Sequence, residues 1–150
     1  EWDIDGKLKY DQNYRGGFER GEQIFYLNGI KASKHYAVLI VFGDEIKSVI
    51  AGSFKIYDLE NGKIKSESFY GTPYEIYGDN SSDDFFKVEN CPDNETSCLK
   101  GISYTYWPDG SIRSRCEYKN GLLHGECNRY SKFDGFNYKN EGYKNGVKVY

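Results

Sequence analysis

The sequence predicts an all-β fold, an elongated antiparallel meander of repeated β-hairpins with at most a short helix in the segment 79–95, and three observations support this. Seven Asp-Gly or Asn-Gly pairs are spaced along the 150 residues, and such pairs favour the positive-φ conformations of tight turns. The segments between them alternate side chains with the period of two that is typical of strands. The pattern also recurs, because Asp109-Gly110 and Asn120-Gly121 reappear 25 residues later as Asp134-Gly135 and Asn145-Gly146.

The repeat indicates one continuous domain over 1–150, with copies at about 5–31, 61–78 and 101–150 and inserts at about 32–60 and 79–98. We expect the chain to reverse at the turn glycines of these copies, which are Gly6, Gly17, Gly29, Gly62, Gly110, Gly121, Gly135 and Gly146.

The first copy follows the pattern loosely, with Tyr14 three residues before Gly17, as Tyr118 stands before Gly121. The more hydrophobic stretch after it predicts strands at 36–42, 46–50 and 54–57, with a Gly43-Asp44 turn. The strand at 36–42 shows no alternation, so we expect both of its faces to be buried. Residues 63–70 then alternate again as a strand.

The segment from 75 to 95 is strongly acidic and the least repetitive. Ser81 or Ser82 is a candidate N-cap for a short helix from Asp83 to Val88. Its acidic side chains are candidate partner-binding residues, namely Asp79, Asp83, Asp84, Glu89, Asp93 and Glu95. A calcium loop built from Asp79, Asn80, Asp83 and Asp84 is a weaker alternative, because the spacing of a calcium-binding loop is missing.

In the last copy, Ile112, Ser114, Cys116 and Tyr118 alternate with Arg113, Arg115 and Glu117. If Cys116 faces Cys127, a regular ladder places Tyr118 opposite Gly125.

The four cysteines suggest two local disulfides, Cys91 with Cys98 and Cys116 with Cys127, although four cysteines allow three connectivities. Free thiols or a metal site are weaker alternatives, since no Cys-x-x-Cys is present. Disulfides imply an oxidising compartment, either the periplasm or the exterior.

The chain opens at Glu1 without Met, so we expect a cleaved or omitted N-terminal signal. No apolar run is long enough to span a membrane.

The string from Tyr118 through Asn120-Gly121 to Gly125, followed by Tyr130 and Asp134-Gly135, resembles the bacterial MORN-like repeat in the variant of the YwqK family of antitoxin-type proteins. The resemblance is good over 101–150, fair over 5–31 and thin over 61–78. It implies a meander of MORN-like hairpins that stack on one another and serve as a binding surface, and the family name implies neutralisation of a toxin. No catalytic residue accompanies the motif.

Charge and motif content argue against several functions. Residues 1–98 carry a net charge of −7 and residues 99–150 a net charge of +4, and the whole chain is acidic, which disfavours nucleic-acid binding. His35 and His124 are the only histidines, and a Cys127 nucleophile with His124 as base is excluded if Cys127 is in a disulfide. We expect no catalytic site, no metal and no cofactor.

The leading hypothesis is therefore a non-enzymatic, secreted or periplasmic protein-binding module of bacterial type. Its most specific form is an immunity or antitoxin role. Its partner would dock on the aromatic-rich sheet face or on the acidic segment. The alternative is an envelope protein that is structural or binds glycans through its tyrosines, and an enzyme ranks third. The sequence leaves the oligomeric state open.

Overall fold

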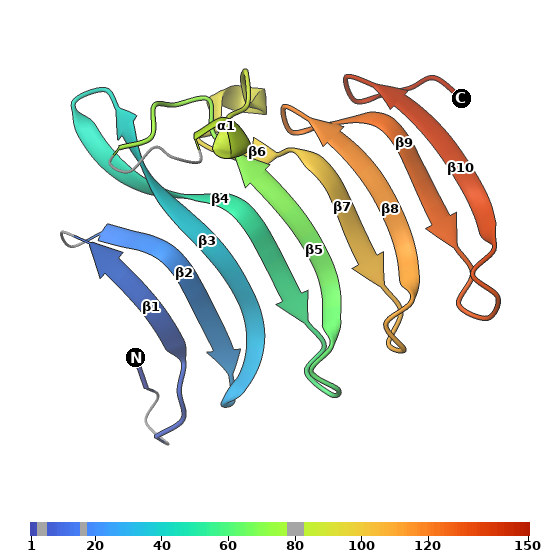
Figure 1. Ribbon diagram of the computed structural model, residues 1–150, viewed down its shortest axis with the longest axis horizontal. Coiled ribbons are helices and arrows are strands. Elements are labelled where there is room, and N and C mark those ends of the chain that lie inside the picture. The colour runs from blue at the N-terminus through green and yellow to red at the C-terminus, as the bar shows by residue number, and fades with distance from the viewer. Residues whose placement is uncertain (3–5, 16–17, 78–82) are drawn as a thin grey trace.

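The computed structural model describes residues 1–2, 6–15, 18–77 and 83–150, and it confirms the all-β expectation. One antiparallel sheet contains β1 (Tyr10–Arg15), β2 (Phe18–Leu27), β3 (Ile30–Phe42), β4 (Glu45–Tyr57), β5 (Ile64–Gly71), β6 (Cys98–Leu99), β7 (Gly101–Tyr106), β8 (Ile112–Lys119), β9 (Leu122–Tyr130), β10 (Asn137–Lys144) and β11 (Val147–Lys148). The strands lie in sequence order along the long axis of the molecule, with the termini at opposite ends (Figure 1). The short β6 pairs with β5 beside β7. The protein is thus an open meander of hairpins.

Asn-Gly pairs make three of the described two-residue turns of this meander, and the expected Gly43-Asp44 turn makes another between Phe42 and Glu45. Asn28, Asn120 and Asn145 have φ values of 52°, 51° and 49°, and the glycine after each also has positive φ. Two consecutive positive-φ residues are the signature of the type I′ hairpin turn, whose twist matches that of the strands.

Asp109-Gly110, Asp134-Gly135 and Asn61-Gly62 occupy slightly longer loops, where glycine takes the left-handed position near the end. The Gly110 amide donates to the Trp107 carbonyl at 2.8 Å, and the Gly135 amide donates to the Ser131 carbonyl at 3.1 Å. Positive φ is confirmed for the expected turn glycines Gly6, Gly29, Gly62, Gly110, Gly121, Gly135 and Gly146, whereas Gly17 lies outside the described residues.

The segment at 32–60, where the repeat pattern lapses, continues the sheet as one long hairpin of β3 and β4. The expected strands at 46–50 and 54–57 form a single strand, and Gly52 inside it has a φ of 80°. Ala37 to Ile40 are buried in succession, as expected for a strand that is covered on both faces. The expectation is wrong for Tyr36, which is 41% exposed, and Val41 and Phe42 are only partly buried.

The main hydrophobic core lies where this hairpin meets the residues that follow β5. Val38, Ile40, Val49 and Ala51 pack with Ile76. The Val41 amide donates to the Glu75 carbonyl at 2.9 Å, and the Tyr77 amide donates to the Leu39 carbonyl at 2.8 Å, so residues 75–77 pair with the free side of β3.

The acidic segment forms one helical turn, α1 (Asp83–Phe86), followed by a 3-10 turn at Pro92–Asn94. The helix is shorter than the expected span to Val88, and its candidate caps Ser81 and Ser82 lie outside the described residues. The Cys91–Cys98 disulfide holds the segment to β6. The Thr72 hydroxyl donates to the Thr96 carbonyl at 2.7 Å and so joins the two ends of the segment. We call residues 72–97 the insert.

The second disulfide, Cys116–Cys127, joins directly opposed residues of β8 and β9 and confirms the expected pairing. The expected pairing of Tyr118 with Gly125 is wrong, because the register shifts after the disulfide and Tyr118 pairs with Leu123. Gly125, at a φ of 110°, lies at this register shift and pairs with Tyr143 of β10 on its other side. The Glu117 side chain fills the space beside Gly125 and accepts a hydrogen bond from the Glu126 amide at 2.6 Å.

Candidate binding surface

The two faces of the sheet carry different side chains. Since directly opposed residues of antiparallel strands point to the same side, the register can be followed across the sheet. On one face, here called the disulfide face, a row of paired residues runs across β5, β7, β8 and β9 and consists of Ser66, Thr105, Ser114 and Arg129. The Cys116–Cys127 disulfide lies in the next row of this face. The other, here called the arginine face, carries a row with Lys55, Glu67, Tyr104, Arg115 and Asn128.

Aromatic and cationic side chains meet at the centre of the arginine face. Tyr104 and Tyr106 stack on each other along β7, with ring centroids 6.1 Å apart and planes 22° apart. Arg115 hydrogen-bonds Tyr104, which is the main reason why the pKa of this guanidinium is raised. At the end of the hairpin, the Arg113 guanidinium lies 4.8 Å from the ring centroid of Trp107, within cation–π range.

Two hollows lie at the two ends of this strip of side chains. The insert pocket, of about 370 Å³, is lined by Phe69, Ile102 and Tyr104 of the sheet, by Phe85 of α1 and by Lys100. The loop pocket, of about 250 Å³, is lined among others by Lys65, Tyr106, Trp107, Arg113 and Lys132. Tyr104 and Tyr106 connect the two, so the arginine face offers one extended surface with a depression at each end.

Lys100 ties the insert to the sheet next to the insert pocket. Its ammonium donates hydrogen bonds to the backbone carbonyls of Phe85 and, at 3.2 Å, Lys87. Burial lowers the pKa of Lys100 from its ordinary value, because desolvation disfavours the charged form. Lys87 in turn donates to the Tyr74 carbonyl at 3.0 Å.

The structure describes the side chains of three of the six acidic residues that the sequence predicts to bind a partner. Glu89 is exposed and lines a third hollow, of about 380 Å³, with Lys87, Lys100 and Lys119. Asp93 and Glu95 are exposed in the loop closed by the Cys91–Cys98 disulfide. Asp83 and Asp84 belong to α1, but their side chains, like all of Asp79, lie outside the described part of the chain.

The side chains of the alternative calcium loop, Asp79, Asn80, Asp83 and Asp84, also lie outside the described part of the chain, so this loop stays a prediction. Within the described ranges, no group of three or more His, Cys, Asp and Glu side chains is arranged to hold a metal ion.

Cys127 and His124, the candidate nucleophile and base, have other roles, and so has His35. All four cysteines are in disulfides, so Cys127 has no thiolate to act as a nucleophile. His124 Nδ1 accepts a hydrogen bond from the Asn145 amide at 3.1 Å. His35 stacks on Phe54 at 5.7 Å, and burial lowers the pKa of its imidazole.

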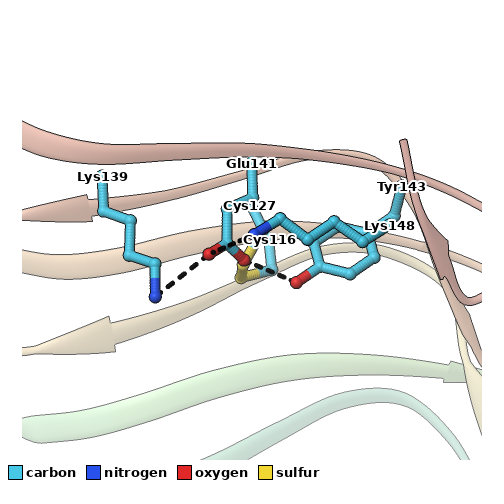
Figure 2. A network of polar contacts seen from close by, with 6 residues as sticks. All are labelled: Cys116, Cys127, Lys139, Glu141, Tyr143 and Lys148. Carbon is cyan, nitrogen blue, oxygen red and sulfur yellow. Dashed lines mark hydrogen bonds and ion pairs between the residues drawn. A yellow bond between two sulfur atoms is a disulfide. The ribbon is translucent and has the colours of Figure 1, made fainter. Parts of the chain in front are cut away.

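A compact polar cluster surrounds Glu141 beside the Cys116–Cys127 disulfide (Figure 2). The Glu141 carboxylate pairs with Lys139 at 3.0 Å and Lys148 at 3.4 Å, and it accepts a hydrogen bond from the Tyr143 hydroxyl at 2.5 Å. The hydrogen bonds from Tyr143 and Lys139 lower the pKa of Glu141 to about 2. Because the partners come from β10 and β11, this cluster joins the last strands of the sheet.

Several residues of the candidate surface were missed by sequence reasoning, above all Phe69, Phe85, Lys100 and Ile102. The adjacent Phe85 and Phe86 in an otherwise acidic segment were a usable signal, since two aromatic residues there indicate that the segment docks on something. The shared face of Arg113 and Arg115 was recognised, and the structure adds the tyrosines around them.

Comparison with known proteins supplies no assignment. No family model matches the chain, and neither the curated proteins nor the solved structures contain a match.

The described part of the chain contains no helix with the length and apolar character that a membrane span requires. The two disulfides indicate an oxidising, extracytoplasmic environment.

Proposed function

We propose that this protein is a non-enzymatic binding module that works in the periplasm or outside the cell and holds a protein partner on its arginine face. The observation that carries the proposal is the strip of Tyr104, Tyr106 and Arg115 between two hollows. Tyr and Arg are the residues that most often supply the binding energy of protein interfaces, because they combine large contact area with directed hydrogen bonds.

The sheet supports this role because it is an open scaffold. Neighbouring hairpins fix the spacing of the side chains, and the two disulfides hold β8 to β9 and the insert to the sheet. Side chains on a rigid sheet lose little conformational entropy when a partner binds. The resemblance to MORN-like repeats of the YwqK type makes an immunity protein against a secreted toxin the sharpest form of the proposal.

The test is capture of a partner by the full disulfide-bonded chain from the culture of its own host, followed by reconstitution with the purified partner. We expect a defined complex with the wild type and at least tenfold weaker binding by the double variant Tyr104→Ala, Arg115→Ala, since hot-spot residues each cost more than about 1 kcal/mol when truncated. Arg129→Ala on the disulfide face is the matched control and should bind as the wild type does.

An immunity role of the protein predicts two further results. The captured partner should be toxic when produced alone, and the purified protein should neutralise it at a one-to-one ratio. A partner that binds equally well to the wild type and to the double variant would refute the proposed surface.

The tyrosine pair also favours a second candidate, an envelope protein that binds glycans. Aromatic side chains on one face suit sugar rings, but Tyr104 and Tyr106 stack on each other, which leaves less of each ring free. Binding of the wild type to isolated cell-wall polysaccharide, lost in Tyr106→Ala, would support this candidate over a protein partner.

A further inference from the structure

The insert pocket differs from the rest of the arginine face because two separate parts of the chain build it. Phe69, Ile102 and Tyr104 come from β5 and β7, whereas Phe85 comes from α1 and meets Phe69 edge to face, with centroids 6.4 Å apart. Phe85 is 54% exposed although it is a large apolar side chain. Gly101 forms part of the lining, and no atom lies within 4 Å of the place where a Cβ would stand, so the pocket stays open there.

Its size and lining fit one bulky side chain and its neighbours. A volume of about 370 Å³ falls within the range of sites that hold small ligands, and the described walls are mainly apolar rings and Ile102. Pockets of this kind at protein interfaces receive an aromatic or large aliphatic anchor from the partner.

The charged side chains that line the insert pocket and the hollow beside it are mostly positive. On the same face, Glu67 stands opposite Tyr104, and Glu117, opposite Ile102, is paired with Arg115. The adjoining hollow shares Lys100 and Gly101 with it and adds Lys87 and Lys119, with Glu89 as the acidic residue in its lining. This differs from the acidic character of the chain as a whole, whose net charge is −3. An anionic group of a partner would therefore be attracted to this end of the arginine face.

Lys100 is placed to receive that anionic group. Its ammonium is partly desolvated, and two backbone carbonyls accept hydrogen bonds from it, which leaves one of its three N–H groups for a ligand. A carboxylate at that position would form a charge-assisted hydrogen bond and would offset the cost of burying the cation.

We propose that the insert pocket binds a bulky apolar side chain from an acidic segment of the protein partner, and that Lys100 binds a carboxylate beside that side chain. This inference rests on the proposed function and names the chemistry of the segment recognised. A peptide segment fits better than a free small molecule, because the pocket opens onto Tyr104 and the strip beyond it, which an extended chain can follow.

The test is a titration of the full ¹⁵N-labelled, disulfide-bonded protein with two blocked peptides, acetyl-Glu-Trp-Asp-amide and its neutral counterpart acetyl-Gln-Trp-Asn-amide. We expect the acidic peptide to shift the amide signals of Phe69, Phe85, Ile102 and Tyr104. It should bind about fivefold more tightly than the neutral peptide, the upper range for an exposed ion pair.

The variants separate charge from structure. Lys100→Gln should remove the preference for the acidic peptide, and Lys100→Arg should retain most of it. Lys144→Gln, which changes an exposed lysine of β10, should leave the preference unchanged. Ile102→Glu places a carboxylate in the pocket and should weaken the acidic peptide more than the neutral one. Each variant is first checked for a spectrum of the folded protein.

Three outcomes would overturn the inference: no shifts at the insert pocket, equal affinity for both peptides, or indole-3-propionate binding as tightly as the acidic peptide, which would indicate a free aromatic acid as the ligand. These outcomes leave the proposed function intact if a captured partner still depends on Tyr104 and Arg115. Absence of such a partner would instead refute the proposed function itself.

Discussion

At the scale of single residues, Gly121 shows how one position can satisfy two requirements. It is the second residue of the type I′ turn between β8 and β9, with a φ of 80°. It also lies against the insert, because an added Cβ would stand 2.7 Å from Pro92 Cδ and 3.0 Å from Cys98 Cβ. The turn and the docking of the insert therefore depend on the same missing side chain.

We predict that Gly121→Ala lowers the free energy of unfolding by about 2–3 kcal/mol, from roughly 1 kcal/mol of backbone strain and a further steric cost. Gly135→Ala is the matched control, because Gly135 has a similar φ of 68° but open space around its Cα. It should lose only about 1 kcal/mol. Urea denaturation measures both, and equal losses would show that contact with Pro92 does not matter.

Glu141 makes stability depend on pH in a defined direction. Its pKa is about 2 in the folded protein against an ordinary value of 4.5, so the unfolded chain takes up the proton first as the pH falls. The stabilisation by Tyr143, Lys139 and Lys148 is therefore present above about pH 4.5 and is lost as the pH approaches 2.

The Glu141→Gln variant should therefore have a lower urea midpoint than the wild type at pH 7, and the two midpoints should converge between pH 4.5 and about 2. Glu60→Gln, in the exposed loop between β4 and β5, controls for a general loss of charge. A difference between wild type and Glu141→Gln that stays constant down to pH 2 would contradict this account.

At the scale of elements, the insert depends on a few attachments to the sheet. The Cys91–Cys98 disulfide closes a loop of short sequence separation, 7 residues, next to Pro92 and the β8–β9 turn. Lys100 holds the other side of the insert through the carbonyls of Phe85 and Lys87. Since Phe85 forms a wall of the insert pocket, these attachments also shape the candidate binding surface.

Replacing this disulfide by the double variant Cys91→Ala, Cys98→Ala should lower stability by about 2 kcal/mol, as expected for closure of a short loop. The insert should also become sensitive to trypsin after Lys87, which is a readout of local opening. In the control Cys116→Ala, Cys127→Ala, the sheet should lose stability while Lys87 stays protected. Identical cleavage of both variants would argue against a local role of the first disulfide.

At the scale of the whole molecule, stability is distributed unevenly along the sheet. Successive strands pair with their neighbours in sequence, and the main cluster of buried apolar residues lies in β3, β4 and the insert. At the far end, β10 is largely exposed, and Phe133 in the loop before it is 95% exposed. Such quasi-one-dimensional arrays open locally, starting from their least buried parts.

Hydrogen exchange should therefore be slowest for the amides of Val38 to Ile40 and their partners in β4, and fastest in β10 and β11. The Cys116–Cys127 disulfide should give β8 and β9 an intermediate rate, because it prevents these strands from separating. Mass spectrometry of the native protein measures this gradient. Uniform protection from β1 to β11 would show that the sheet unfolds as a single cooperative unit.

The sequence by itself determined the local features of this protein. Asn-Gly and Asp-Gly pairs specify turns because only a few residue types accept positive φ, and alternation specifies strands because side chains of a strand point to opposite sides. These local rules predicted the hairpins of the meander, and they suggested the pairing of Cys116 with Cys127 because the two residues bracket one predicted hairpin.

Only the tertiary structure decided the register beyond that disulfide and the composition of the candidate surface. Tyr118 does not face Gly125, because the ladder from the two-residue turn pairs it with Leu123 and the register shifts before the disulfide. The Glu117 side chain occupies the space beside Gly125, and a contact of this kind depends on side-chain volume in three dimensions. The insert pocket likewise joins Phe69, Phe85 and Tyr104, which are distant in sequence. No local pattern relates such residues, since their proximity results from the way the insert packs on the sheet.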